Sequence, residues 1–167
     1  MAGVSVNIHA TCLRLAGAGR PFGTPRDCGV LLVGGSGSGK SDLALRLIAA
    51  GAELVADDRT DLFVLRGRLY GRAPARLAGL LEIRSVGIVK LPHATQARIT
   101  LVAKLGQSGE RLPVRRFYKP PAALGLLAKA APPIISLSPL EASAPAKLAA
   151  ATAAYALGLY REDANPV

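Results

Sequence analysis

The chain has 167 residues, half of them hydrophobic, a length typical of one compact domain, so we predict a single domain over residues 1–167. Its 21 lysines and arginines against 11 aspartates and glutamates give a formal net charge of +10, which favours anionic ligands or acidic protein partners, while an aromatic content of 4% argues against nucleic acid. No apolar run approaches the roughly 20 residues of a membrane-spanning helix and no signal peptide is recognisable, so we expect a cytoplasmic protein without a membrane partner.

The first elements of the chain are predicted to be a strand, a loop, a second strand and a helix. The strand spans residues 4–15 and carries His9 near its middle, because apolar residues alternate with polar ones in its first part. Residues 16–28 are rich in glycine and proline and are typical of a loop. An apolar strand at 30–33 and a helix over 40–51 follow.

Between the second strand and the helix lies a glycine-rich segment with the phosphate-binding pattern G-x-x-x-x-G-K-[ST]. Its residues are Gly34, Gly35, Ser36, Gly37, Ser38, Gly39, Lys40 and Ser41. In such a loop backbone N–H groups face a polyphosphate, Lys40 neutralises the β- and γ-phosphates, and the Ser41 hydroxyl ligates Mg²⁺. The pattern predicts binding of a nucleotide or another polyphosphate and leaves the acceptor open.

Two carboxylates follow the next predicted strand. Residues 54–56 form a short apolar strand that runs directly into Asp57 and Asp58. Ligands of open α/β sheets collect at the carboxyl ends of strands, so both side chains are expected near the phosphates. They are candidates for metal ligation or for a general base.

The rest of the chain is predicted to be rich in strands. Glu82 and Arg84 are expected on one face of an extended segment, roughly 7 Å apart, with Ile83 facing the core. The other predicted elements are a hairpin of 62–65 and 69–70, a helical turn at 76–81, strands at 86–91, 97–105 and 134–137, a loop or hairpin at 113–133, and a helix at 144–159.

Four features, in this order, resemble the catalytic domain of bacterial HPr kinase/phosphorylase: His9, the phosphate loop, the run 55–58 and the run Leu-Glu-Ile-Arg-Ser-Val-Gly-Ile at 81–88. The resemblance covers about residues 4–112. It implies an α/β fold with a central sheet, of the phosphate-loop type shared by HPr kinase and PEP carboxykinase. It also implies a serine kinase that transfers phosphate from ATP, or from pyrophosphate, to an HPr-like phosphocarrier protein of the phosphotransferase system.

The resemblance also implies roles for individual residues. Gly34 to Ser41 would bind the phosphates, and Ser41 and Glu82 would hold Mg²⁺. Asp58 would accept the proton of the serine, with Asp57 in support. The remaining matches to catalytic residues of the family are His9, Lys40, Arg84 and Arg111; the two arginines would stabilise charge on the transferring phosphoryl group.

Several features depart from the family pattern. Ser85 stands where the family has glycine, and the family's N-terminal domain has no counterpart, as in a short form made of the catalytic domain alone. After Arg111 the chain has residues 135–141 in place of a family segment tied to dephosphorylation. Dephosphorylation by phosphorolysis and a homo-oligomeric state are therefore left open.

Two other functions remain as alternatives. A small-molecule kinase would use the same phosphate loop, with turnover stimulated by a metabolite rather than by a protein. A nucleotide-binding sensor would bind ATP without turnover and would tolerate loss of Asp58.

Overall fold

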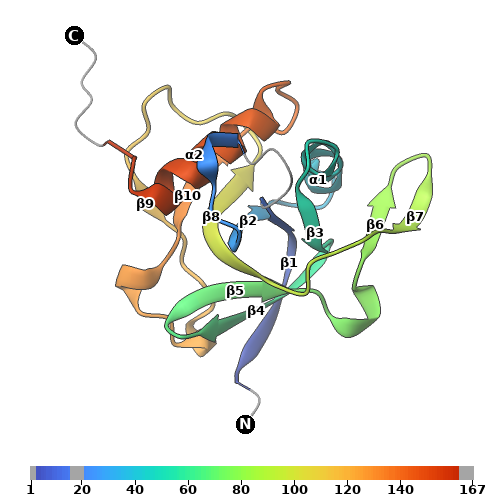
Figure 1. Ribbon diagram of the computed structural model, residues 1–167, viewed down its shortest axis with the longest axis horizontal. Coiled ribbons are helices and arrows are strands. Elements are labelled where there is room, and N and C mark those ends of the chain that lie inside the picture. Colours follow the sequence, from blue (N-terminus) through green and yellow to red (C-terminus); the bar gives the residue numbers. More distant parts are fainter. Residues whose placement is uncertain (1–2, 16–20, 162–167) are drawn as a thin grey trace.

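The computed structural model describes residues 3–15 and 21–161 (Figure 1). The strands are β1 (Ser5–Arg14), β2 (Cys28–Val33), β3 (Glu53–Ala56), β4 (Arg59–Leu65), β5 (Arg68–Arg72), β6 (Leu80–Ile83), β7 (Gly87–Lys90), β8 (Ala97–Leu105), β9 (Arg116–Phe117) and β10 (Pro133–Leu137). The helices are α1 (Lys40–Ala49) and α2 (Ala144–Leu157), with short 3₁₀ turns η1 (Pro21–Gly23), η2 (Ala75–Leu77), η3 (Ala122–Leu124) and η4 (Ala128–Ala130).

The main sheet folds back on itself, because two long strands each pair with different partners along their length. β1 pairs with β4 through residues 5–9 and with β2 through residues 10–14. β8 pairs with β5 near its start and with β2, in parallel, over most of its length. The pairings β2–β1–β4–β5–β8–β2 therefore close a ring, to which β3, β10 and β9 are added.

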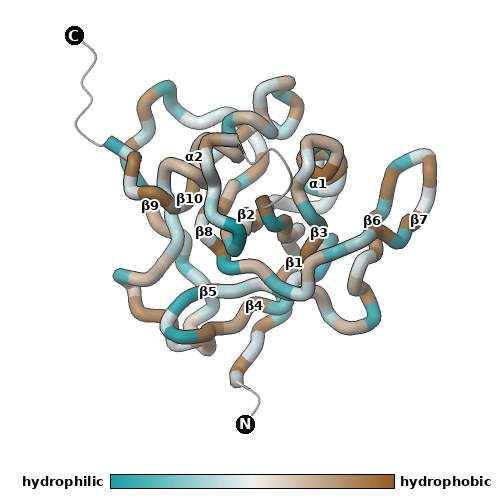
Figure 2. The backbone as a smooth tube through the Cα atoms, in the orientation of Figure 1, coloured by the Kyte–Doolittle hydropathy of each residue, from teal (hydrophilic) through white to brown (hydrophobic). Residues whose placement is uncertain are grey.

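The apolar residues form two clusters, one on each side of this sheet. Val30 and Leu32 of β2 point outward and pack with buried residues of α1 and α2, whereas Leu31 points into the ring. This alternation is what the period of two along a strand requires. Both helices thus cover the same outer side of the sheet, and Figure 2 shows apolar stretches on α1 and on the separate β6–β7 hairpin.

The helix that follows the phosphate loop is held against the segment before α2. Arg46 of α1 donates to the carbonyl oxygen of Glu141 at 3.2 Å and also to that of Pro139. Its Nε forms an ion pair with Asp42 one turn earlier, at 3.1 Å. These contacts hold α1, the helix that begins where the phosphate loop ends, against the segment 139–141.

The predicted α/β fold with a central sheet is confirmed, and most predicted elements are present. The helical turn predicted at 76–81 is confirmed only in part: residues 75–77 form a 3₁₀ turn, but β6 begins at Leu80 because it pairs with β7. Arg84 is not in an extended segment, since β6 ends at Ile83 and residues 84–86 form a turn.

Two loop predictions are refined. Of the predicted loop 16–28, residues 16–20 lie outside the described residues, and β2 already begins at Cys28. The stretch 113–133 is not a hairpin, because its one short strand, β9, pairs with β10. Within the described parts of the chain, no helix has the length and apolar character needed to cross a bilayer.

Candidate active site

The phosphate loop joins β2, in the middle of the sheet, to α1. Gly37 and Gly39 have φ angles of 75° and 87°, a left-handed conformation that glycine adopts without strain. A Cβ atom on Gly34 would lie 2.6 Å from the Ser38 hydroxyl oxygen, and one on Gly39 would lie 3.1 Å from Pro139. Gly34, Gly37 and Gly39 are therefore required by the loop conformation or by close packing, whereas a Cβ atom on Gly35 would meet no other atom within 4 Å.

Lys40 lies inside the loop and is 6% exposed. Its Nζ donates to the carbonyl oxygens of Gly34 at 2.9 Å and of Gly35 at 2.8 Å. Burial lowers the pKa of Lys40 below its ordinary value, and the negative charges of Asp58 and Asp57 oppose that shift. A cation held this way can exchange its carbonyl partners for phosphate oxygens.

Asp57 connects three elements of the site. It is 6% exposed, and its Oδ1 accepts hydrogen bonds from Ser41 at 3.0 Å and from Thr11 at 2.9 Å. Its Oδ2 accepts the backbone N–H of Glu82 at 3.3 Å. The aspartate thus fixes the hydroxyl that ends the phosphate motif and the backbone of the residue predicted to hold Mg²⁺.

Asp58 faces the opposite way and is paired with His9. The His9 Nε2 lies 3.1 Å from Asp58 Oδ1, and Arg59 Nε lies 3.9 Å from Oδ2. The φ angle of Asp58 is 60°, a left-handed value that few residues other than glycine adopt and that aspartate tolerates better than most. This turn directs one aspartate inward and exposes 67% of the Asp58 side chain.

Thr11 is a site residue that sequence reasoning missed. It is fully buried on β1, two residues after His9, and strand side chains two residues apart share a face. His9 therefore reaches Asp58 while Thr11 reaches Asp57. The signal that could have found it was the alternation along β1, in which the polar residues at 5, 7, 9 and 11 share one face, so that Thr11 lies on the same face as His9.

The two predicted arginines lie in an exposed turn and an exposed loop, whereas the aspartates directly follow the buried strand β3. Arg84 is exposed in the turn between β6 and β7, and Glu82, also exposed, precedes it on β6. Arg111 is exposed in the loop over 106–115. Among the described residues, Arg111 has no hydrogen bond or ion pair with the phosphate loop, the aspartates or His9.

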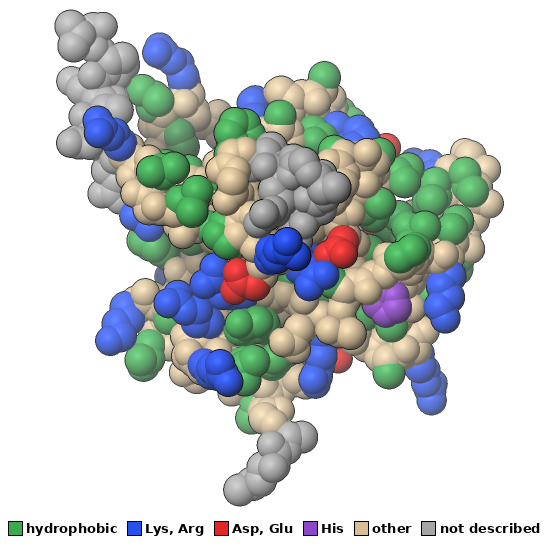
Figure 3. All heavy atoms as spheres, in the orientation of Figure 1, with side chains coloured by type: hydrophobic (Ala, Val, Ile, Leu, Met, Phe, Trp, Pro, Cys, Tyr) green, Lys and Arg blue, Asp and Glu red, His purple; other side chains and the backbone are tan. Residues whose placement is uncertain are grey.

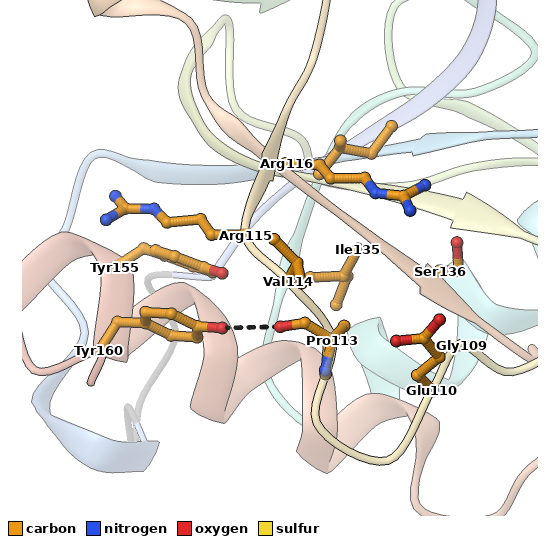
Figure 4. Close-up of a pocket in the computed structure, with 11 residues that line it drawn as sticks. Gly109, Glu110, Pro113, Val114, Arg115, Arg116, Ile135, Ser136, Tyr155 and Tyr160 are labelled. Carbon is orange, nitrogen blue, oxygen red and sulfur yellow. Dashed lines mark hydrogen bonds between the residues drawn. The ribbon is translucent and has the colours of Figure 1, made fainter. Parts of the chain in front are cut away.

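A pocket of about 190 Å³ lies between part of that loop, with Arg116 after it, β10 and the end of α2 (Figure 4). The Arg115 guanidinium lies over the rings of Phe117, Tyr155 and Tyr160, at 5.1, 5.3 and 5.7 Å from their centroids. The Tyr160 hydroxyl donates to the Pro113 carbonyl oxygen at 3.5 Å. None of the predicted phosphate, metal or catalytic residues lines this pocket.

The donor set beside Asp57 fits a magnesium ion. In the described parts of the chain no three His, Cys, Asp or Glu side chains are grouped as a metal cage. Mg²⁺ does not need one, because it is usually held by one or two protein oxygens together with substrate phosphates and water. The Ser41 hydroxyl and the Glu82 carboxylate offer such oxygens.

Comparisons with known proteins identify the family of this chain. The family model described as the HPr Serine kinase C-terminal domain matches residues 25–108. The matched range contains the phosphate loop, both aspartates, Glu82 and Arg84, whereas His9 and Arg111 lie outside it.

Similar proteins carry HPr kinase names. Over 64 residues the chain is 47% identical to HPr kinase/phosphorylase from Clostridium tetani and 52% identical to that from Leptothrix cholodnii. These matches cover 38% of this chain and 21% and 20% of the two relatives, about a fifth of their length. The solved structure of the Hpr(Ser) kinase/phosphatase from Coxiella burnetii matches 92% of this chain and 98% of its own, with a TM-score of 0.68 and 23% identity, which shows a shared fold.

Proposed function

Because the chain belongs to the HPr serine kinase C-terminal domain family, we propose that it is an ATP-dependent kinase that phosphorylates a serine of an HPr-like phosphocarrier protein. The observation that carries the proposal is the pair Asp57 and Asp58. One aspartate holds the Ser41 hydroxyl of the phosphate loop, and its neighbour turns outward beside His9. A fixed phosphate site and an exposed base next to it are what transfer to a hydroxyl group needs.

The donor phosphates would lie on the phosphate loop. Backbone N–H groups at the start of α1 favour anions, and Lys40 is close enough to reach them by leaving the carbonyls of Gly34 and Gly35. Mg²⁺, held by Ser41 and Glu82, would neutralise charge on the β- and γ-phosphate oxygens. Asp57 would keep Ser41 oriented throughout, because it accepts the Ser41 hydroxyl proton in a hydrogen bond.

Asp58 would act as the base. As the serine oxygen forms its bond to the γ-phosphorus, the bond from that phosphorus to the bridging oxygen breaks and ADP leaves. The serine proton passes to the Asp58 carboxylate, which is exposed and therefore accessible to a bulky acceptor. His9, within 3.1 Å, would hold that carboxylate in place.

The arginines would contribute positive charge at the transferring phosphoryl group. Arg84 is close in sequence to Glu82, so it would act from the hairpin turn. Arg111 belongs to an exposed loop and would have to approach when the substrates bind. Such arginines can contribute on the order of 10³ to 10⁵ in rate.

Four further expectations belong to this proposal. Pyrophosphate carries the same phosphoanhydride bond as ATP, so the same loop suits it as an alternative donor. Phosphorolysis of the phosphoserine would use the same residues in reverse. The enzyme would work in the cytoplasm, and assembly of several copies is compatible with the fold.

The test is a phosphorylation assay with Mg²⁺-ATP and HPr-like proteins of the same source, followed by peptide mapping of the phosphate. We expect serine phosphate on the carrier, and a loss of about 10² to 10⁴ in rate for Asp58→Asn with ATP binding retained. Asp61→Asn, three residues further along on β4, is the matched control and should behave as wild type.

The same assay separates the alternatives. Turnover of ATP that responds to a metabolite and not to any carrier would indicate a small-molecule kinase. ATP binding without turnover, unaffected by Asp58→Asn, would indicate a sensor.

A further inference from the structure

The β6–β7 hairpin has one face on the core and one face in solvent. Its register places Glu82 opposite Ile88 and Leu81 opposite Val89. Residues opposite each other point to the same face, so the Leu81 face, with Leu81 fully buried, lies on the core. Ile88 shares the other face with Glu82 and is 73% exposed.

A second large apolar side chain is exposed at the hairpin turn. Val86 is 71% exposed, and its backbone N–H donates to the Ile83 carbonyl oxygen at 3.0 Å, which fixes the turn. Figure 1 shows the hairpin projecting from the body of the molecule, and Figure 3 shows apolar side chains gathered over this end. Val86 and Ile88 therefore form an apolar surface on a projecting hairpin, here called the hairpin surface.

The hairpin surface lies beside the proposed phosphoryl-transfer site. The Glu82 N–H is 3.3 Å from Asp57 Oδ2, and the Ser41 hydroxyl is 3.2 Å from the same oxygen. Side chains opposite each other on antiparallel strands have Cβ atoms about 5 Å apart, so Ile88 is a direct neighbour of the Glu82 carboxylate. An exposed isoleucine next to a charged site has no role in holding phosphates or metal.

A protein substrate would cover this surface, whereas a small-molecule substrate would not. A typical interface buries about 800 Å² on each partner, equivalent to a disc of about 16 Å radius. A protein that presents a serine at Asp58 would therefore extend over the hairpin. The charged neighbours Arg84 and Lys90 are both exposed, and the chain carries a net charge of +10, so the complementary partner is acidic around an apolar patch.

From these observations we infer that the hairpin surface, Val86 and Ile88 flanked by Lys90, is the docking site for the protein substrate. That partner would be acidic, and it would contact the hairpin surface through an apolar patch beside the serine that it presents. The inference rests on the proposed kinase function and adds to it the surface that selects the protein. Binding energy at such interfaces is concentrated in a few central apolar or aromatic side chains. Val86 and Ile88 would serve as those side chains.

The test compares Val86→Ser/Ile88→Ser with Val4→Ser, a control that makes the same change at a valine 61% exposed just before β1. The measurements are the KM for the phosphocarrier, the rate at saturating carrier, and the affinity for Mg²⁺-ATP. We expect the double variant to raise the carrier KM about tenfold or more, with the other two values unchanged. Lys90→Glu should raise the same KM, and by more at low salt.

Each other outcome overturns the inference in a distinguishable way. If wild type phosphorylates the carrier and the double variant has the same KM, the kinase function stands and the docking site is wrong. If light scattering shows that the double variant changes only the oligomeric state, the surface joins copies of this chain. If wild type phosphorylates no carrier, the proposed function fails and the inference fails with it. Should the double variant not fold by circular dichroism, Lys90→Glu decides alone.

Discussion

The phosphate loop and the loop over 106–115 differ in how the protein holds them. The phosphate loop begins at a central strand, ends in a helix pinned by Arg46, and closes around a buried lysine. The loop that carries Arg111 is exposed along its whole length and is joined to the rest by a few contacts, among them Ser108 with Glu141. The part of the site proposed to receive the phosphate donor is therefore preformed, whereas Arg111 lies in an exposed loop that few contacts hold.

Limited proteolysis should show the largest contrast between the two loops. We expect trypsin to cleave after Arg111 at least about 10³ times faster than after Arg46, because an exposed loop opens at almost no free-energy cost while α1 must unfold. Mass spectrometry of timed digests gives both rates. Equal rates would mean that the loop is as firmly held as the helix.

Removing the lysine of the phosphate loop should give the next largest effect. Lys40→Ala deletes the buried cation and its bonds to Gly34 and Gly35, and we expect ATP affinity to fall about 10- to 100-fold. Lys129→Ala, on the exposed turn η4, should leave the affinity unchanged. Calorimetric titration measures both, and an unaltered affinity for Lys40→Ala would refute the phosphate-loop assignment.

These contrasts also explain what could be predicted from sequence. The phosphate loop and Asp57-Asp58 were predictable because each is a run of consecutive residues. In the phosphate loop, the glycines also dictate the local conformation. Thr11 was not, since its contact with Asp57 depends on how β1 lies beside β3. The helical turn predicted at 76–81 extended too far, into the first two residues of β6, because pairing with β7 decides the conformation of those residues.

The arginines show the same limit. Arg84 was expected in a strand, but the chain turns immediately after Ile83, where Ser85 has a left-handed φ of 67°. The match between Arg111 and a family arginine predicted the type of residue only, because the exposed loop around Arg111 does not fix its position. Long-range register and loop position are the two properties that motif and periodicity do not encode.

Thr11 offers a smaller and more specific test of the preformed part of the site, which contains the phosphate loop and Asp57. Thr11→Val replaces the buried hydroxyl with a methyl group and leaves Asp57 one donor short, so we expect the apparent affinity for Mg²⁺ in the presence of ATP to fall about tenfold. Thr11→Ser keeps the hydroxyl and should restore it. If both variants bind Mg²⁺ like wild type and differ only in thermal stability, Thr11 has a packing role alone.

The smallest expected effect concerns Glu141, which accepts a hydrogen bond from Ser108 of the exposed loop. Hydrogen bonds from Lys147 and Ser108 lower the pKa of Glu141 below its ordinary value. A carboxyl group with a lowered folded-state pKa stabilises the protein above its unfolded-state pKa, and that contribution is lost as the pH falls through the folded-state value.

Glu141→Gln should therefore lower the thermal midpoint by about one or two degrees at pH 7 and by less at pH 3. Glu110→Gln, in the same loop, is the control that should change neither midpoint. A difference from wild type that is equal at both pH values would show that the charge of Glu141 is not responsible.

The most direct test of the account is a crystal structure of the protein with Mg²⁺ and a non-hydrolysable ATP analogue. We predict phosphates on Gly34 to Ser41, the Lys40 amino group moved from the loop carbonyls to the phosphates, Mg²⁺ held by Ser41 and Glu82, and the γ-phosphate facing Asp58. Phosphates bound elsewhere, or a metal ion held without Ser41 and Glu82, would contradict the proposal that these residues form one phosphoryl-transfer site.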